Sequence, residues 1–249
     1  IHPAGLYEAI CPIVEGDGTF EYDIPALLRI HDETRPAVVL LSSPNNPTGN
    51  AMDPDDLQRV LRHMRETVVV LDEAYCPVGV RENGNIASLQ AEYPKLLIVR
   101  TFSKYYALAG IRIGYAVLGA ELGRLERFSA RYLGYHRLSE AVAIAALDSP
   151  DYYRDIAAKM EEDREMFRLR LGALPGFTVY RSRANFVLVK MPAELMAPLK
   201  HSLLVQGMVV KFMDEEHLHS HMRITLGTQE NNRRLVDAIT AFMHSAAAA

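Results

Sequence analysis

The sequence predicts an α/β protein with a large domain that has three layers around a mostly parallel sheet, followed by a small α+β C-terminal domain. In the first half, short apolar runs alternate with helical segments, the pattern of βαβ units and parallel strands. In the second half, long helical segments accompany a few short strands, which is typical of an α+β unit. The 249 residues fit one large domain or two modest ones. We place the domains at 1–138 and 139–249.

The first half contains four apolar runs that we interpret as strands. They lie at 36–41, 67–71, 95–99 and 111–118. The run at 67–71 is rich in β-branched residues, so we expect it to be covered on both faces of the sheet. An edge strand is expected near residues 10–15.

A helix is predicted between the first two of these runs. Asp53 suits the N-cap, where its carboxylate can accept a backbone hydrogen bond, and Pro54 suits the first helical position. We expect the helix to end near Arg65.

The second half is predicted to be mostly helical at first and mixed afterwards. Helical periodicity runs over 138–174 with a break at Ser149-Pro150. The other expected elements are two strands within 176–190 joined by a turn at 181–183, a helix at 194–206, strands at 208–211 and 222–226, and a closing helix at 229–244.

Composition excludes several classes of function. A net charge of -4 argues against a general nucleic-acid binder. No apolar run approaches the ~20 residues that span a bilayer, and no charged-then-apolar leader opens the chain. Two cysteines, Cys11 and Cys76, are too few for a disulfide framework. We therefore expect a reducing compartment and a cytoplasmic location.

Three polar motifs come directly after three of the predicted strands. They are Ser-Ser-Pro-Asn-Asn-Pro-Thr-Gly at 42–49, Asp-Glu-Ala-Tyr at 72–75 and Thr-Phe-Ser-Lys at 101–104. Each alone has an ordinary interpretation as a turn, a cap or a solvated loop. Ligands of open α/β sheets bind beyond the carboxyl ends of the strands, so the convergence of all three motifs favours a functional site there.

The motifs also resemble a known family. The string Arg-Thr-Phe-Ser-Lys-Tyr-Tyr-Ala-Leu-Ala-Gly-Ile-Arg-Ile-Gly-Tyr at 100–115 resembles the lysine segment of fold-type I, pyridoxal-phosphate-dependent class I/II aminotransferases. The motifs at 45–49 and 72–75 occur in that family in the same order. Arg-Ile-Thr-Leu-Gly-Thr at 223–228 resembles the carboxylate-binding strand of the histidinol-phosphate aminotransferase branch. The resemblance covers essentially the whole chain and implies pyridoxal 5'-phosphate as cofactor and a homodimer.

The resemblance also implies that the chain is partial. The family has a substantial N-terminal portion before the point where this chain begins. That portion carries a glycine turn at the cofactor phosphate and the aromatic residue that stacks on the pyridine ring. We therefore expect the large domain to lack its N-terminal portion.

The lysine segment carries the first group of implied roles. Lys104 is the Schiff-base lysine, which must lose its proton to act as nucleophile and base. Arg112 and the Ser103 hydroxyl bind the cofactor phosphate, because a planar guanidinium contacts phosphate oxygens in pairs. Thr101 is a further phosphate contact. The positive field of Arg112 also favours the neutral amine of Lys104.

The other implied roles come from the remaining motifs. Asp72 pairs with the pyridine nitrogen and keeps the ring protonated, which makes the cofactor an electron sink. Tyr75 and the Asn46 amide reach the phenolic oxygen of the ring. Arg223 binds the substrate α-carboxylate; apart from the resemblance, an arginine on a strand surface is an equally good interpretation.

Three functions remain open from the sequence. The first is an aminotransferase that moves an amino group between histidinol phosphate or a related, for example aromatic, L-amino acid and a 2-oxo acid. The second is a pyridoxal-phosphate-dependent decarboxylase, such as one acting on threonine phosphate. The third is a non-catalytic aminotransferase-like domain of a regulator. No nucleic-acid or membrane partner is expected.

No metal site is predicted. His217, His219 and His221 alternate in a way that could place them on one face of a strand. No cysteine or carboxylate motif completes a ligand set around them.

Overall fold

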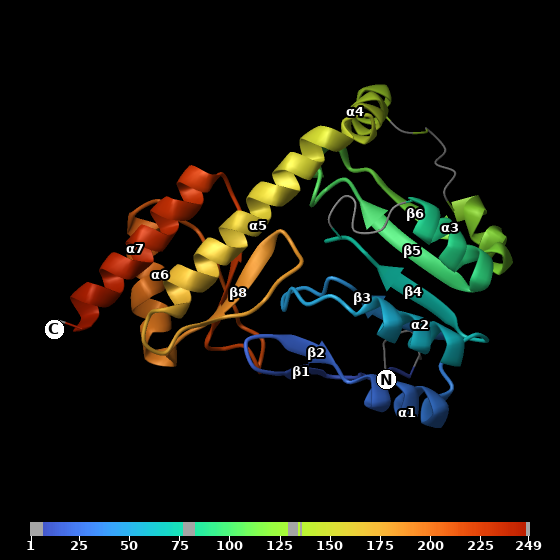
Figure 1. Cartoon of the computed structure of the whole chain (residues 1–249), viewed down its shortest axis with the longest axis horizontal. Coiled ribbons are helices and arrows are strands. Elements are labelled where there is room, and N and C mark those ends of the chain that lie inside the picture. The colour runs from blue at the N-terminus through green and yellow to red at the C-terminus, as the bar shows by residue number, and fades with distance from the viewer. Residues whose placement is uncertain (1–6, 77–82, 129–133, 135, 248–249) are drawn as a thin grey trace.

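The computed structural model describes residues 7–76, 83–128, 134 and 136–247. Its elements form two groups, and Figure 1 shows the first on the right and the second, which includes the long helix α5 (Pro150–Gly172), on the left. The first group is built on a sheet from the first half of the chain. The second is built on a sheet from the C-terminal third.

The first sheet has four strands in the order β3 (Val38–Ser42), β4 (Val68–Asp72), β5 (Leu96–Thr101) and β6 (Gly114–Leu118). β3, β4 and β5 are parallel, whereas β6 runs antiparallel to β5. β6 reverses direction because the chain turns back through the short helix η1 (Ala109–Ile111) without a crossover. The prediction of an α/β protein with a mostly parallel sheet is confirmed.

One face of this sheet is packed against helices α1 (Ile24–Thr34), α2 (Pro54–His63) and α3 (Asn83–Glu92). Strand residues that point toward these helices are buried, among them Leu41, Leu71 and Ile98. On the opposite face Val38 and Leu40 of β3 are 54% and 69% exposed. In β4, where cover on both faces was expected, Val69 and Leu71 are buried, whereas Val68 and Val70 on the other face are only partly buried.

The start of α2 follows the predicted capping chemistry. The Asp53 carboxylate accepts a hydrogen bond of 2.9 Å from the Asp55 backbone N–H, and Pro54 occupies the first turn. Leu57, Val60 and Leu61 form its buried face. The helix ends at His63, two residues before the expected end.

Helix α1 was not predicted. It begins in the same way, since the Asp23 carboxylate accepts from the Ala26 N–H at 2.9 Å and a proline occupies the first turn. The short hairpin of β1 (Ile13–Glu15) and β2 (Phe20–Tyr22) precedes it.

The second sheet is antiparallel throughout, in the order β7 (Thr178–Val179), β8 (Phe186–Lys190), β10 (His221–Thr225) and β9 (Lys211–Phe212). Its core packs against α5, α6 (Met196–Val205) and α7 (Gln229–Ala247). Two further short helices are η2 (Ala120–Phe128) and η3 (Ala193–Leu195). Helix α4 (Arg137–Leu147) ends before the predicted break, and α5 begins at Pro150.

The alternating histidines do not share a strand face. β10 begins only at His221, which is buried, while His217 and His219 are exposed in the preceding loop. The strand interpretation of that alternation was wrong, because the chain becomes extended only after it.

The β1–β2 hairpin is attached to the second sheet by a small polar cluster. The Tyr180 hydroxyl donates to the Glu15 carboxylate, and Lys190 donates to the same oxygen at 2.8 Å. His221 lies against the Tyr180 ring with 5.7 Å between centroids. Burial, helped by the positive charge of Lys190, lowers the pKa of His221.

No helix within the described ranges combines the length and the apolar character that crossing a bilayer would require.

Candidate active site

The three polar motifs meet at one edge of the first sheet. Ser42, Asp72 and Val99 are paired across β3, β4 and β5, so the carboxyl ends of the three strands are in register. The segments that follow them therefore start side by side, as the sequence predicted.

The turn after β3 is fixed by hydrogen bonds within the turn and by contacts with the second half of the chain. Inside it, the Asn45 amide donates to Thr48 Oγ1 at 2.6 Å. Gly49 has a φ of +77°, and a side chain there would collide with Ser182. The Gly49 carbonyl also accepts a 2.7 Å hydrogen bond from the Arg183 N–H. The turn that carries Asn46 is thereby fixed against the loop before β8.

Aromatic and cationic side chains form a continuous group around Phe186. The Lys104 Nζ lies 5.5 Å from the centroid of the Tyr75 ring. The Tyr75 ring meets Phe186 edge-on at 5.2 Å. The Arg223 guanidinium carbon lies 5.3 Å from the Phe186 ring, and its Nη1 donates to Asn46 Oδ1 at 2.5 Å. Four of the predicted residues are thus gathered around Phe186. We call Phe186 and these four residues, Asn46, Tyr75, Lys104 and Arg223, the Phe186 group.

Arg223 is positioned by β10, where it pairs with Leu188 of β8. Its Nε atom is buried and has no hydrogen-bond partner among the described residues. A buried donor without an acceptor is costly, and the cost disappears when an acceptor arrives. The site therefore holds an arginine with one buried donor that no described residue accepts from.

Asp72 ends β4 and is half-buried. One of its carboxylate oxygens accepts a 2.9 Å hydrogen bond from the Ala74 N–H, which shapes the turn leading to Tyr75. Among the described residues, no hydrogen bond or ion pair joins Asp72 to Lys104 or Tyr75. Asp72 therefore caps the turn, as one of the sequence interpretations proposed. The hydrogen bond to Ala74 orients its carboxylate at the end of β4.

Thr101 and Ser103 lie where β5 turns toward Lys104. The Thr101 hydroxyl oxygen accepts from the Ser103 N–H at 3.0 Å and fixes this turn. Arg112 follows η1 with a φ of +56° and is exposed. Its guanidinium donates to the Ala109 carbonyl at 3.0 Å. Among the described residues, no hydrogen bond or ion pair joins Arg112 to Ser103 or Lys104, and none joins it to the Phe186 group.

Two features near the site were not predicted from the sequence. Phe186 looks like any buried aromatic in an apolar strand, and no local signal distinguishes it. The second is a buried ion pair, in which the Glu73 carboxylate accepts a hydrogen bond of 2.8 Å from Arg100 Nε and lies 2.7 Å from Arg100 Nη2. Although burial opposes the charge, the facing Glu73 carboxylate raises the pKa of Arg100. The pair ties β4 to β5 directly beneath the site.

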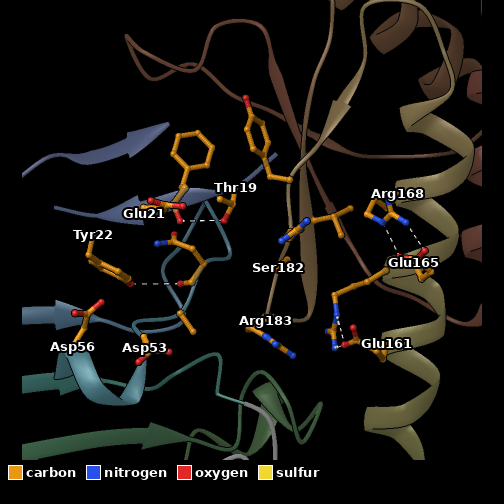
Figure 2. Close-up of a pocket in the computed structure, with 17 residues that line it drawn as sticks. Thr19, Glu21, Tyr22, Asp53, Asp56, Glu161, Glu165, Arg168, Ser182 and Arg183 are labelled. Atoms are coloured by element: carbon orange, nitrogen blue, oxygen red, sulfur yellow. Dashed lines mark hydrogen bonds and ion pairs between the residues drawn. The ribbon is translucent and has the colours of Figure 1, made fainter. Parts of the chain in front are cut away.

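A polar cavity of about 510 Å³ lies beside this region, between the β1–β2 hairpin, α5 and the loop at 181–183 (Figure 2). Two of the four arginines that line it are paired with acids on the same helix, Arg164 with Glu161 and Arg168 with Glu165. None of the predicted site residues lines it. The cavity is therefore separate from the Phe186 group.

Comparison with known proteins identifies the family. The model of the aminotransferase class I and II family matches residues 8–239. The chain is 32% identical to the histidinol-phosphate aminotransferase of Ruminiclostridium cellulolyticum, over 97% of this chain and 69% of that protein.

Two solved structures are also similar. The histidinol-phosphate aminotransferase of Sinorhizobium meliloti, in complex with pyridoxal-5'-phosphate, is 27% identical, with a TM-score of 0.76 over 92% of this chain and 63% of that one. The L-threonine-O-3-phosphate decarboxylase of Porphyromonas gingivalis is 26% identical, with a TM-score of 0.68 over 83% of this chain and 64% of that one. The chain spans 63 to 69% of the length of these three proteins. By its family match and its relatives, this chain belongs to the class I and II aminotransferases.

Proposed function

We propose that this chain forms most of a pyridoxal-phosphate-dependent aminotransferase. The enzyme moves an amino group between histidinol phosphate, or a related and for example aromatic L-amino acid, and a 2-oxo acid. The observation that carries this proposal is the Phe186 group with its buried, unpartnered Arg223 Nε. It places an amine, a phenol, an amide and a free guanidinium donor at one edge of the sheet.

The donor set fits pyridoxal phosphate. Lys104 lies in the loop that follows β5 and is exposed, and it would hold the cofactor through its Nζ atom. Asp72 supplies a carboxylate for the pyridine nitrogen, and Tyr75 and the Asn46 amide supply donors for the phenolic oxygen. Bound pyridoxal phosphate supplies an electron sink for the bond broken at the substrate α-carbon.

The phosphate would be held by the loop around Lys104. Ser103 contributes its hydroxyl, with Thr101 fixing the turn through its bond to the Ser103 N–H. Arg112 contributes two guanidinium donors once its side chain leaves the Ala109 carbonyl. The exposure of Arg112 leaves it free to make that change.

The remaining chemistry belongs to protein side chains. The guanidinium of Arg223 would bind the α-carboxylate through Nε and Nη, a planar pair of donors that fixes both position and orientation. The Lys104 amine would then move a proton from the substrate α-carbon to the cofactor carbon that bears the nitrogen, and would move one in the reverse direction in the second half of the reaction. Phe186, which is buried and packs against the Arg223 guanidinium, would keep water from one side of that group.

Decarboxylation is the second candidate, supported by the similarity to the Porphyromonas gingivalis decarboxylase. The same side chains serve both reactions, because the choice depends on which bond of the α-carbon stands perpendicular to the ring. A non-catalytic role is less well supported, since Lys104 and Arg223 are both present and lie in one group.

The domain division at 1–138 and 139–249, a homodimer and a cytoplasmic location remain part of the proposal. Two separate cores support the division, one around α1–α3 and one around α5–α7.

The test uses the full-length protein that contains this chain, loaded with pyridoxal phosphate. Histidinol phosphate, aromatic amino acids and phosphothreonine are offered as donors, with 2-oxoglutarate as acceptor, and both new 2-oxo acid and carbon dioxide are measured. Lys104→Ala should reduce transamination by at least about 10³-fold, while Lys200→Ala on the exposed face of α6 should not. Carbon dioxide without a 2-oxo acid would establish the decarboxylase instead. Equal rates for Lys104→Ala and wild type would refute both.

A further inference from the structure

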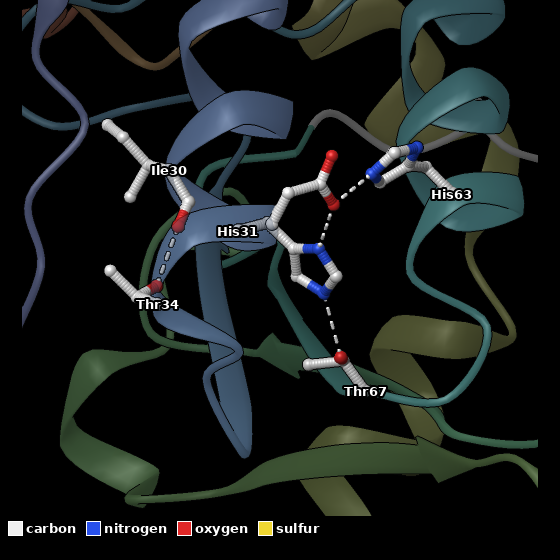
Figure 3. A network of polar contacts seen from close by, with 6 residues as sticks. Ile30, His31, Thr34, His63 and Thr67 are labelled. Atoms are coloured by element: carbon white, nitrogen blue, oxygen red, sulfur yellow. Dashed lines mark hydrogen bonds and ion pairs between the residues drawn. The ribbon is translucent and has the colours of Figure 1, made fainter.

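Three polar side chains converge at the C-terminal ends of α1 and α2, away from the candidate active site. His31 and Asp32 come from the last turns of α1, and His63 is the last residue of α2 (Figure 3). They lie near Thr67, just before the first residue of β4, whereas Asp72 ends that strand. At ~3.3 Å per residue, five residues of strand separate the two places by roughly 16 Å.

The converging atoms are all possible metal ligands. Asp32 Oδ1 lies 3.2 Å from His31 Nδ1 and 2.6 Å from His63 Nε2. All three atoms lie within 4.8 Å of one another. Ligands at ~2.0–2.1 Å from a tetrahedral zinc ion are about 3.3 Å apart. The His31–Asp32 separation matches this value, and the His63–Asp32 separation needs to open by about 0.7 Å. His63 can make this adjustment because its side chain is 36% exposed at a helix end.

The far side of His31 is already held. Its Nε2 lies 2.9 Å from the Thr67 hydroxyl, which can accept a hydrogen bond from that nitrogen. Metal-binding histidines usually donate their second ring N–H to such a partner, which fixes the tautomer and leaves the other nitrogen for the metal. Thr67 is buried, so the imidazole plane has a fixed support.

The local field favours a cation. The C-terminal end of a helix carries partial negative charge, and here two such ends meet, since α1 and α2 pack together. The Asp32 carboxylate stands in the last turn of α1 and faces His63, the last residue of α2, at 2.6 Å. Asp32 is 59% exposed, which leaves the site open to metal and to water ligands.

We propose that His31 Nδ1, Asp32 Oδ1 and His63 Nε2 bind one divalent transition-metal ion, with Zn²⁺ as the best match, and that water completes the coordination. Two imidazoles and one carboxylate are a ligand set that zinc accepts. The ion links α1 to α2 beside the start of β4 and so stabilises the first domain. It takes no part in the chemistry at Lys104, because it lies at the other end of the strands.

The experiment uses the untagged full-length protein that contains this chain, stripped of metal with EDTA and freed of pyridoxal phosphate. Co²⁺ is added first, because a bound cobalt ion gives visible absorption bands that report direct coordination, and Zn²⁺ is then used to displace it. Thermal unfolding is measured with and without Zn²⁺. One equivalent of Co²⁺ should bind, and a hundredfold excess of Zn²⁺ over its Kd should raise Tm by roughly 5 °C or more.

Variants distinguish this site from other histidines. His63→Ala should weaken Co²⁺ binding at least tenfold and remove the Tm shift. Asp32→Asn should weaken it similarly while keeping the shape of the side chain. His219→Ala removes an exposed histidine outside the cluster and should leave binding unchanged.

Two outcomes would overturn the proposal. If wild type gives no cobalt bands, the three side chains form only a hydrogen-bonded network. If binding persists in both His63→Ala and Asp32→Asn, the metal is bound elsewhere. Neither outcome bears on the proposed transamination, since the assay contains no cofactor or substrate.

Discussion

Replacing Gly49 by alanine should destabilise the protein more than the same change at a matched glycine. Gly49 has a φ of +77°, and an added Cβ would lie 2.4 Å from Ser182 Oγ and 2.8 Å from Ser182 Cβ. Ser182 cannot simply rotate away. Its hydroxyl donates to the Phe186 carbonyl at 2.6 Å and accepts from the Ala184 N–H at 3.1 Å.

The expected cost has two parts. A non-glycine residue in the left-handed region costs about 1–2 kcal/mol. Displacing a packed neighbour costs about 1–3 kcal/mol more. Gly49→Ala should therefore lower the free energy of unfolding by about 2–5 kcal/mol. Gly18 separates the two parts, because it has a φ of +63° with no atom within 4 Å of an added Cβ. Gly18→Ala should cost only the first part.

Urea unfolding followed by circular dichroism measures both variants, with free energies from linear extrapolation. A third variant, Ser182→Gly, removes the atoms that the added methyl group would strike. In that background Gly49→Ala should cost only about 1–2 kcal/mol. The difference between the two backgrounds is the coupling energy of the contact.

The reasoning fails if Gly49→Ala and Gly18→Ala cost the same. It also fails if the Ser182→Gly background makes no difference. Either result would mean that the turn carrying Asn46 does not press against the loop before β8.

Three further changes test other parts of the structure. Glu73→Gln should lower the free energy of unfolding in urea by about 3 kcal/mol, because it leaves the half-buried Arg100 without its carboxylate. Glu66→Gln, at a carboxylate that is 93% exposed, should lower it by less than about 0.5 kcal/mol. Equal costs for the two variants would contradict the buried pair. His221 has a pKa below its unfolded value, so the unfolded chain binds more protons below about pH 6.5 and stability should fall from about pH 7.5 to about 5.5. His221→Phe should flatten this fall in the urea midpoint, and an unchanged slope would assign it to other groups. Phe186→Leu should lower the free energy of unfolding by about 1–2 kcal/mol. In the full-length protein it should also raise KM for the amino donor more than it lowers kcat. An unchanged KM would show that Phe186 has no part in substrate binding.

Elements that depend on local chemistry were predictable. β3, β4 and β5 are continuous apolar runs, and α2 begins where Asp53 and Pro54 together provide a cap and a preset first turn. α1 carries the same signals at Asp23 and Pro25, and they were available to be recognised. Such features are written within a few neighbouring residues, so the sequence alone shows them.

The contacts that shape the site depend on distant parts of the chain. Arg223 and Asn46 are 177 positions apart, and their hydrogen bond requires both sheets to be in place. The motifs contain Lys104, Tyr75, Asn46 and Arg223, which the structure brings together, and also Arg112, which it leaves apart; they did not indicate that Phe186 joins the group. His63 likewise meets Asp32 across 31 positions, and neither lies in a spacing typical of metal ligands. Exposure of Leu40 was also unforeseen, because a run of apolar residues shows that a strand can be covered but not what covers it.

The hydrogen bond between Arg223 and Asn46 has a consequence for how a substrate would enter. In the proposed reaction, an incoming carboxylate exchanges with a neutral amide that already occupies one donor of the arginine. The arginine is charged in both bonds, but only the substrate carboxylate also brings a full negative charge and can accept two parallel hydrogen bonds, so the exchange runs toward the substrate. The same step frees the Asn46 side chain on the side of the cofactor. Carboxylate binding to Arg223 and loss of its hydrogen bond to Asn46 thus occur together. Substrate binding at β10 of the second sheet would therefore change the contacts of the turn after β3 in the first sheet.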